Sequence, residues 1–231
     1  MTRPIVKPSS DPATPRAGLP PSRRELRRDR IRSELVTAGL DLFKRKGYDA
    51  TTISDIVESV AMSPRTFFRY FKSKDDLVFE WMDRQGEFVD PVLSARPRDE
   101  TPLQAMEQTF LELADVHDDN REHTYFLTHL VFDTPSLSGR YHLEHAKWED
   151  DFINVLQRSR AGTPEERFML RVQVSTAITA FVTAIRSWAE AGDLQPLRPW
   201  VGAAFAALAG KPIKLPDTAK SGRKQTHRNP R

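Results

Sequence analysis

Cysteine is absent from this chain of 231 residues. Without thiols the chain forms no disulfide framework, thiolate metal site or thiol nucleophile, and it suits a reducing cytoplasm. No uninterrupted apolar run approaches the roughly 20 residues that span a bilayer. Residues 1–21 also lack the apolar segment of a signal peptide. We therefore expect a soluble, cytoplasmic protein with no membrane partner.

Signatures of catalysis are missing as well. The sequence contains neither a Gly-x-Ser-x-Gly motif nor a glycine-rich phosphate loop. The acidic pairs Asp118-Asp119 and Asp150-Asp151 are adjacent residues, which point to different sides of a helix and make poor acid/base pairs. His142 and His145 lie one turn apart and could share a metal, although histidines on exposed helix faces usually bind none. We predict no enzyme, no catalytic residue, no cofactor and no metal site.

The net charge of +3 is small, but the charge is unevenly distributed. Residues 1–84 hold 17 Lys and Arg against 12 Asp and Glu, whereas residues 85–210 hold 11 against 19. Residues 211–231 are basic again, with 7 against 1. A basic front and an acidic middle favour contact of the front with a polyanion, although solvated helices can carry such charges without any partner.

Proline is concentrated in residues 1–22, which hold six of them and few apolar side chains. This composition predicts a disordered basic arm, and residues 211–231 form a second disordered basic tail. Both tails either contact DNA phosphates or serve only as solubilising extensions.

Apolar residues recur at helical spacing through the rest of the chain, which predicts an all-α fold. The first helix covers 23–46, and short helices start at Thr52 and at Ser63-Pro64, where a capping side chain precedes the first turn. Ser73, with Asp76 three residues later, is expected to cap a fourth helix. Beyond Thr101 the predicted helices are 102–118, 121–133, 138–160, 164–191 and 197–209, with breaks that include Pro135 and Gly139.

The two short helices predict a helix-turn-helix, in which the first braces the second in the major groove. The bracing helix is apolar at Ile53, Ile56 and Val57. The second helix buries Phe67 and Phe71, four residues apart, and leaves its other faces free. We therefore expect an N-terminal three-helix helix-turn-helix domain over 23–84 and a C-terminal helical bundle domain over 85–210.

The side chains of this segment suit DNA. Arginine reads guanine edges with two hydrogen bonds, and threonine methyl groups or aromatic rings contact thymine methyls. The helix starts at Thr52 and Ser63 can receive phosphates on their backbone N–H groups, and Lys74 can hold a further phosphate. The predicted DNA-binding residues are Thr51, Thr52, Ser63, Pro64, Arg65, Thr66, Phe67, Phe68, Arg69, Tyr70 and Lys74.

Residues 27–81 resemble the N-terminal domain of tetracycline-repressor-type (TetR family) regulators. The resemblance lies in the contiguous stretches 51–57, 62–71 and 72–77, which match the bracing helix, the recognition helix and the start of helix four. Ala61 stands where the family often has glycine, which requires the backbone either to avoid the left-handed region or to accept strain. Phe68 stands where tyrosine is frequent. The resemblance implies a homodimer that binds a palindromic double-stranded DNA operator, usually as a repressor.

The C-terminal half is more weakly similar to the branch with acyl-CoA-like ligands and to regulators associated with mycofactocin clusters. The similarity lies in 133–137 and 170–208, and it implies a small effector, apolar or acyl-CoA-like. The apolar helices at 164–191 and 197–209 suit either a four-helix dimer interface or plain core packing. The predicted ligand-binding residues, which could equally be core, are Phe110, Leu113, His117, Phe126, Leu130, Trp148, Phe152, Arg171 and Phe181. Among them Arg171 could meet an anionic head group or equally form an ion pair.

Two other interpretations remain open. A turnover assay would identify an enzyme, but the sequence suggests no substrate for such an assay. A helical interaction protein without a DNA role would account for the C-terminal helices, but it would leave the Ser63-Pro64-Arg65 helix start unexplained.

Overall fold

A computed structural model describes residues 22–157, 162–192 and 194–216 of the chain. The predicted arm over 1–22, apart from Ser22, and most of the predicted tail over 211–231 lie outside these residues. In the described part the regular structure is helical, as predicted. The helices are α1 (Arg23–Lys46), α2 (Ile53–Ser59), α3 (Pro64–Tyr70), α4 (Asp75–Ser94), α5 (Pro102–Asp119), α6 (Arg121–Asp133), α7 (Pro135–Gln157), α8 (Pro164–Ala191) and α9 (Arg198–Leu208).

Side-chain caps fix most of the helix starts. The hydroxyls of Ser22, Thr52 and Ser63 accept backbone N–H groups at the starts of α1, α2 and α3, and Thr101 and Thr163 do the same for α5 and α8. Each cap satisfies a donor that has no partner within its helix. The predicted boundaries of these helices are therefore close to the observed ones.

Two predicted features of the helix boundaries are wrong. Ser73 does not cap α4 through its hydroxyl, since no backbone N–H of the helix donates to it, although the Asp76 carboxylate accepts the backbone N–H groups of Lys72 and Ser73, at 2.5 and 3.3 Å. The chain also does not break at Gly139, since α7 begins at Pro135 and continues through it. Proline suits a first turn because it needs no N–H partner there.

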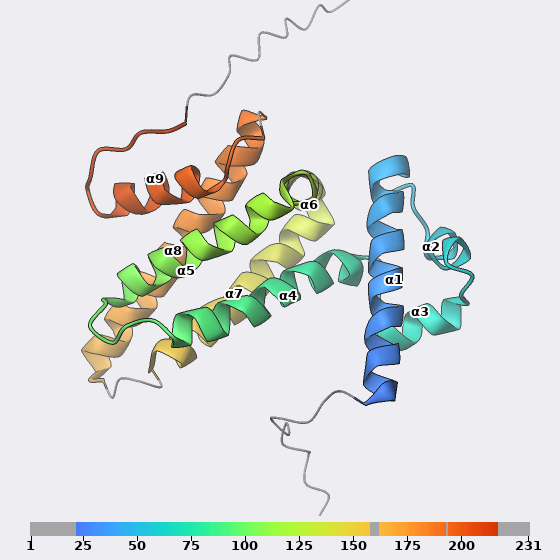
Figure 1. Cartoon of the computed structure of the whole chain (residues 1–231), viewed down its shortest axis with the longest axis horizontal. Helices are drawn as coiled ribbons and strands as arrows, with labels where there is room; N and C mark the ends of the chain where they lie inside the picture. Colours follow the sequence, from blue (N-terminus) through green and yellow to red (C-terminus); the bar gives the residue numbers. More distant parts are fainter. Residues whose placement is uncertain (1–21, 158–161, 193, 217–231) are drawn as a thin grey trace, which may run out of the picture.

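The arrangement has two parts connected by α4 (Figure 1). Helices α2 and α3 lie on the side of α1 away from the bundle, and α5 to α9 form that bundle. Helix α4 starts beside α1 and runs into the bundle, so the predicted division at 84/85 falls within a continuous helix.

The apolar core also crosses the division between the two parts. One buried cluster joins Leu35 of α1, Phe67 of α3 and Leu77 of α4 to Leu127 of α6 and Leu137 of α7. A second cluster fills the space among α5, α7, α8 and α9. The helix-turn-helix therefore rests on α6 and α7 as well as on its own helices.

Helix α8 is the one described helix that is long and apolar enough to cross a membrane by length and composition. An 18-residue window in it has a mean hydropathy of 1.5, and 44% of that window is buried within the protein. Val174, Ala177 and Trp188 of α8 are almost fully buried in the second core cluster. These contacts are typical of the central helix of a helical bundle.

Candidate nucleic-acid interface

Helix α2 is held in place by both its cap and its buried face. The Thr52 hydroxyl accepts the backbone N–H of Asp55 at 3.1 Å, and the Asp55 carboxylate accepts the N–H of Thr52 at 2.8 Å. Lys46 donates to the same carboxylate at 2.7 Å, and this hydrogen bond, with those from Thr52, holds the pKa of Asp55 well below its usual range. Ile56 and Val57 are buried beneath the helix. Helix α2 therefore has the bracing position that the sequence predicts.

The turn after α2 uses the left-handed region. Ala61 has φ of 51°, its N–H donates to the Glu58 carbonyl at 3.2 Å, and the Met62 N–H donates to the Val57 carbonyl at 2.8 Å. This pair of hydrogen bonds closes a helix end in the Schellman manner, which glycine normally serves. The chain therefore accepts the strain at Ala61 instead of avoiding it.

Ala61→Gly is expected to raise the free energy of unfolding by up to about 1 kcal/mol. The substitution relieves a left-handed cost of roughly 1–2 kcal/mol, and the greater freedom of glycine in the unfolded chain offsets roughly 0.5–1 kcal/mol of that gain. Urea denaturation measures the change. Ala61→Val is the comparison, because a β-branched side chain should increase the strain at this φ and lower stability. A lower stability for the glycine variant would contradict the strain.

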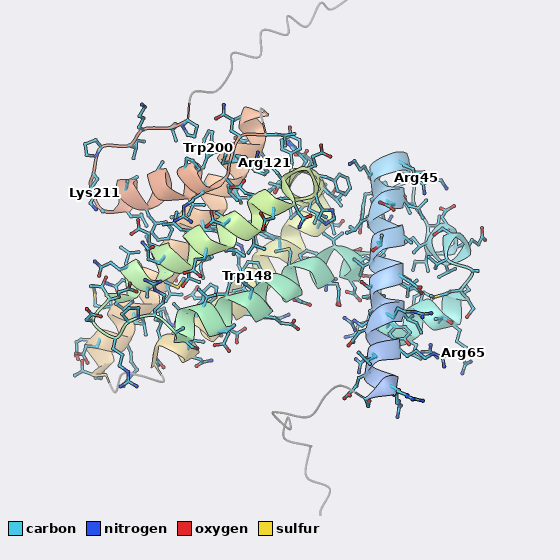
Figure 2. The ribbon with its side chains drawn as sticks, viewed as in Figure 1. Arg45, Arg65, Arg121, Trp148, Trp200 and Lys211 are labelled. Atoms are coloured by element: carbon cyan, nitrogen blue, oxygen red, sulfur yellow. The ribbon has the colours of Figure 1, made fainter. Side chains whose placement is uncertain are left out.

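Helix α3 presents two faces of opposite character. Phe67 is fully buried and Phe71 is 3% exposed, whereas Phe68 is 58% exposed. Arg65 and Arg69 are exposed on the outer side, and Figure 2 shows Arg65 at the end of the molecule away from the bundle. The Arg69 guanidinium lies over the Tyr70 ring, 4.9 Å from its centroid. The free face of α3 is thus cationic and aromatic.

Two predicted DNA-binding residues are placed in the interior instead. Phe67 packs in the core under α3, so its ring is unavailable to bases. Thr51 is 1% exposed, and its hydroxyl donates to the Gly47 carbonyl at 2.7 Å. The threonine is therefore needed to shape the loop between α1 and α2.

Lys74 has a structural role in addition to the predicted one. Its ammonium donates to the carbonyls of Tyr48 and Thr51, at 2.7 and 3.1 Å, and lies 4.2 Å from the centroid of the Tyr48 ring. An ammonium group has three N–H donors, so one remains for a phosphate. The lysine thus fastens the start of α4 to the loop before α2.

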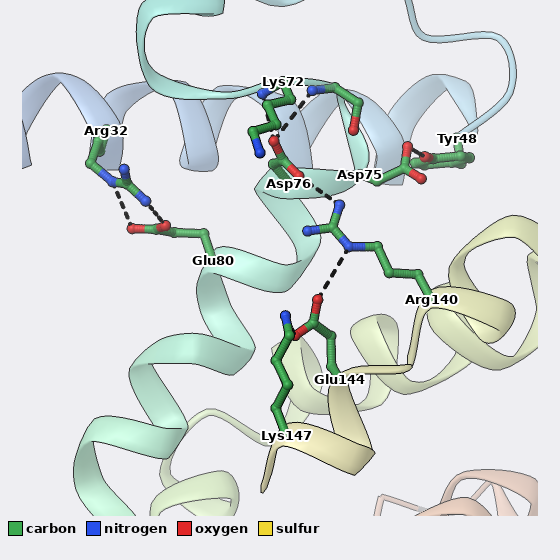
Figure 3. Close-up of polar contacts among 10 residues, drawn as sticks. Arg32, Tyr48, Lys72, Asp75, Asp76, Glu80, Arg140, Glu144 and Lys147 are labelled. Carbon is green, nitrogen blue, oxygen red and sulfur yellow. Dashed lines mark hydrogen bonds and ion pairs between the residues drawn. The ribbon is translucent and has the colours of Figure 1, made fainter. Parts of the chain in front are cut away.

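A chain of ion pairs connects the helix-turn-helix to α7 (Figure 3). Arg32 of α1 donates from Nε to Glu80 of α4 at 3.0 Å, and Arg140 of α7 donates to Asp76 of α4 at 2.6 Å. Arg140 also lies 3.6 Å from Glu144. Burial raises the pKa of Asp76, but the hydrogen bonds from the Lys72 backbone N–H and the Arg140 guanidinium lower it by more. The net result is a pKa below the usual value for an aspartate. The start of α4 is thereby tied to both α1 and α7.

An apolar cavity of about 70 Å³ lies between α4 and the bundle. Its walls come from five helices, with Met82 on α4, Phe110 on α5, Val131 on α6, Tyr141 on α7 and Phe181 on α8. The rings of Phe110 and Phe181 stack with centroids 4.5 Å apart. The cavity therefore touches the same helix, α4, that carries the ion pairs to α1.

His117 lies in the wall of this cavity. Burial lowers the pKa of His117 to about 4, so the imidazole is neutral near pH 7. Its Nδ1 lies 3.3 Å from the Thr124 hydroxyl, and its ring stacks on Phe181 at a centroid distance of 6.2 Å. The histidine adds a polar edge to the wall without adding a charge.

Comparison with known proteins yields matches along both halves of the chain. The profile of bacterial regulatory proteins of the tetR family matches residues 35–81, and that of the MftR C-terminal domain matches residues 100–211. The HTH-type transcriptional regulator TcmR of Streptomyces glaucescens is 30% identical over 174 residues, which cover 73% of this chain and 77% of TcmR. The chain belongs to the TetR family.

Solved structures of TetR-family regulators share the fold. One from Nitrosomonas europaea has a TM-score of 0.55 at 16% identity, and the match covers 79% of this chain and 99% of that one. FadR of Thermus thermophilus, solved in complex with lauroyl-CoA, has a TM-score of 0.50 at 18% identity, with 81% and 98% covered. The predicted all-α architecture and the predicted family of transcriptional regulators, including the mycofactocin-associated C-terminal branch, are confirmed.

The predicted ligand residues of this TetR-family regulator separate into two groups. The cavity is lined by six of them, namely Phe110, Leu113, His117, Trp148, Phe152 and Phe181. The other three lie elsewhere. Phe126 borders a surface groove beside α1, and Leu130 is buried in the core shared with the helix-turn-helix. Arg171 is exposed and pairs with Glu149 at 3.3 Å and Asp150 at 3.5 Å.

Part of the cavity wall was not predicted from the sequence. Val78 and Met82 of α4 and Tyr141 of α7 line it, yet the division at 84/85 assigned α4 to the other domain. The continuous apolar spacing of α4 beyond residue 84, through Val89 and Leu93, is the signal that indicates a helix shared by both parts.

Proposed function

We propose that this TetR-family regulator is a homodimeric repressor that binds a palindromic operator through α3 and leaves it when a small effector enters the apolar cavity. The observation that carries the proposal is the exposed, arginine-bearing face of α3, opposite a face buried at Phe67. In this proposal residues 23–84 bind DNA, and residues 85–210 dimerise and form most of the effector cavity, whose wall Val78 and Met82 complete.

On the DNA, Arg65 and Arg69 are assigned to base edges in the major groove. Thr66, Phe68 and Tyr70 lie on the same helix and supply methyl, aromatic and hydroxyl contacts. The segments at Thr52 and Ser63-Pro64, with Lys74, are assigned to phosphates. Two such helices in a dimer would enter successive major grooves, with half-site centres roughly 34–36 Å apart.

Fluorescence anisotropy on the intergenic DNA upstream of the protein's own gene tests the proposal. Binding that withstands excess nonspecific DNA supports a sequence-specific regulator, and a salt series estimates the number of phosphate contacts. If nonspecific competitor abolishes binding to every upstream fragment, the protein has no operator upstream of its own gene. Selection of binding sites from random DNA then distinguishes a distant operator from charge-driven contact alone.

The proposed dimer interface lies on the outer face of α8. Phe168, Met169 and Val172 are 66%, 52% and 43% exposed there. Further along the helix the hydroxyls of Thr176, Thr179 and Thr183 donate to the carbonyls four residues earlier, at 2.6–2.8 Å. These internal hydrogen bonds satisfy the hydroxyls, so the face is apolar and narrow enough for close helix packing.

Thr179→Glu is expected to convert the dimer to a monomer at micromolar concentration, because the dimer would place two unpaired carboxylates against an apolar face. Sedimentation velocity measures the change. Ala146→Glu, on the exposed side of α7, carries the same charge and should leave the dimer intact. A dimeric Thr179→Glu protein would place the interface elsewhere.

Release from DNA is proposed to proceed through α4. An effector in the cavity contacts Val78 and Met82, which lie within two turns of Asp76 and Glu80, the residues that join α4 to α7 and α1. Movement of α4 would carry α1 and α3 with it and change the distance between half-sites. Because coupling is reciprocal, operator DNA must weaken effector binding by the same factor, and calorimetry with and without operator tests this equality.

A further inference from the structure

The hydroxyl of Tyr141 is a polar group in the cavity wall, beside the polar side chains of His117 and Thr128. The Tyr141 side chain is 6% exposed and lines the cavity. Within the described parts of the chain, no side chain or backbone group forms a hydrogen bond with its hydroxyl. A hydroxyl that faces an apolar cavity without a partner gains a hydrogen bond when a ligand supplies an acceptor or donor. Such a group is therefore poised to bond a ligand atom.

The rest of the wall is aliphatic and aromatic apart from His117 and Thr128, and the described part of it carries no acidic or basic side chain other than the neutral imidazole. None of the lining residues in the described ranges is Asp, Glu, Lys or Arg. The rings in the wall are those of Phe110, His117, Phe132, Tyr141, Trp148, Phe152 and Phe181. The rings of Phe132 and Tyr141 and of Phe110 and Phe152 meet nearly edge to face, with interplanar angles of 73° and 78°. Aromatic pairs favour edge-to-face and stacked geometries, so the ring of an aromatic ligand could pack favourably against the rings of the wall.

The size of the cavity adds a condition. At about 70 Å³ it holds roughly half the volume of an engineered cavity of about 150 Å³ that binds benzene. A ring can therefore enter only if a wall residue moves. Met82 has the flexible, unbranched side chain that adapts most readily, and it belongs to α4. Entry of a ligand and displacement of α4 would then be one event.

We propose that the cavity takes an uncharged aromatic ligand with one hydroxyl or carbonyl group, which bonds to the Tyr141 hydroxyl. The proposal rests on the proposed effector function of the same cavity and selects the apolar class of effector over the acyl-CoA-like one. Arg171, the cation that the sequence offered for an anionic head group, lies on the surface in ion pairs with Glu149 and Asp150. An anion in the cavity would be buried without a counter-charge.

Ligand-observed NMR titration of the full chain with phenol, toluene and benzoate, three probes of similar size, tests the proposal. Phenol and toluene should bind, whereas benzoate should bind at least about tenfold more weakly than phenol, because a carboxylate loses its hydration in an apolar wall. Tyr141→Phe should weaken phenol relative to toluene by about 2- to 10-fold, the equivalent of one hydrogen bond. Tyr125→Phe, whose hydroxyl lies outside the cavity, should leave that ratio unchanged.

Three results would overturn the proposal. They are equal binding of benzoate and phenol, a phenol-to-toluene ratio unaffected by Tyr141→Phe, and displacement of phenol by lauroyl-CoA with an affinity that exceeds that of every aromatic probe. Thermal unfolding of Tyr141→Phe establishes that the variant is folded, since loss of an unpartnered hydroxyl should not lower stability. Operator binding measured on the same samples shows separately whether the proposed regulator function holds, so failure of one can be distinguished from failure of the other.

Discussion

Phe67→Ala is expected to lower the free energy of unfolding by about 3–5 kcal/mol, the usual cost of removing a buried phenylalanine. Phe67 is fully buried, and its ring lies 5.6 Å from that of Phe71, centroid to centroid. It belongs to the cluster that joins the helix-turn-helix to α6 and α7. The cavity left behind cannot collapse easily, because helices from both halves of the chain form its walls. Urea denaturation followed by circular dichroism measures the loss.

The adjacent residue supplies the control for Phe67→Ala. Phe68 is 58% exposed on the other side of the same helix, so Phe68→Ala removes an equal ring with little effect on stability. If Phe68 contacts a base, Phe68→Ala should lower the affinity for the operator and leave stability nearly unchanged. A large loss of stability in Phe68→Ala, or a small one in Phe67→Ala, would show that the orientation of α3 differs from the one described.

Arg65→Ala and Arg69→Ala are each expected to weaken operator binding by about 1–3 kcal/mol, or about 5- to 150-fold, if each guanidinium reads a guanine edge. Both side chains are exposed on the outer face of α3, so their removal should leave stability nearly unchanged. The loss should depend on sequence, since a lost base contact relaxes discrimination at one position. Anisotropy titrations against operators with single base changes measure it.

Lys147→Ala controls for the loss of one positive charge. Lys147 lies on α7 and pairs with Glu144 at 2.6 Å, away from α3. Its removal should change binding to all DNA sequences slightly and alike. If Arg65→Ala and Arg69→Ala behaved in the same way as Lys147→Ala, the two arginines would contact no bases and the proposed docking of α3 would be wrong.

Local chemistry made the DNA-binding half largely predictable. The starts of α2 and α3 follow from Thr52 and Ser63-Pro64, because a capping hydroxyl and a proline act within a few residues. The burial of Phe67 and the exposure of Arg65 and Arg69 follow from helical spacing, although Phe67 still appeared among the predicted DNA contacts. Ala61 shows the limit, since only the structure decides between avoiding and accepting the left-handed region.

Features that depend on distant partners were not predictable. The Ser73 hydroxyl accepts no backbone N–H of α4, and the Asp76 carboxylate, which accepts the N–H groups of Lys72 and Ser73, also pairs with Arg140 from 64 residues away in sequence. The wall of the cavity gains Val78 and Met82 only because α4 passes through the predicted boundary. For Arg171 the sequence left open an anionic head group or an ion pair, and only the structure decides for the ion pairs with the acidic side chains of α7.

The continuity of α4 has a consequence for recombination between related regulators. A chimaera joined at 84/85 would divide α4 in the middle of the helix. Each half of α4 would then come from a different regulator and would have to pack against helices of the other one. The α1–α3 segment of a donor would also have to match the apolar surface of α6 and α7 around Leu127 and Leu137. Exchange of DNA specificity by grafting only the exposed side chains of α3 preserves both requirements. Shuffled descendants of this chain should therefore tolerate new operators more readily than new domain junctions.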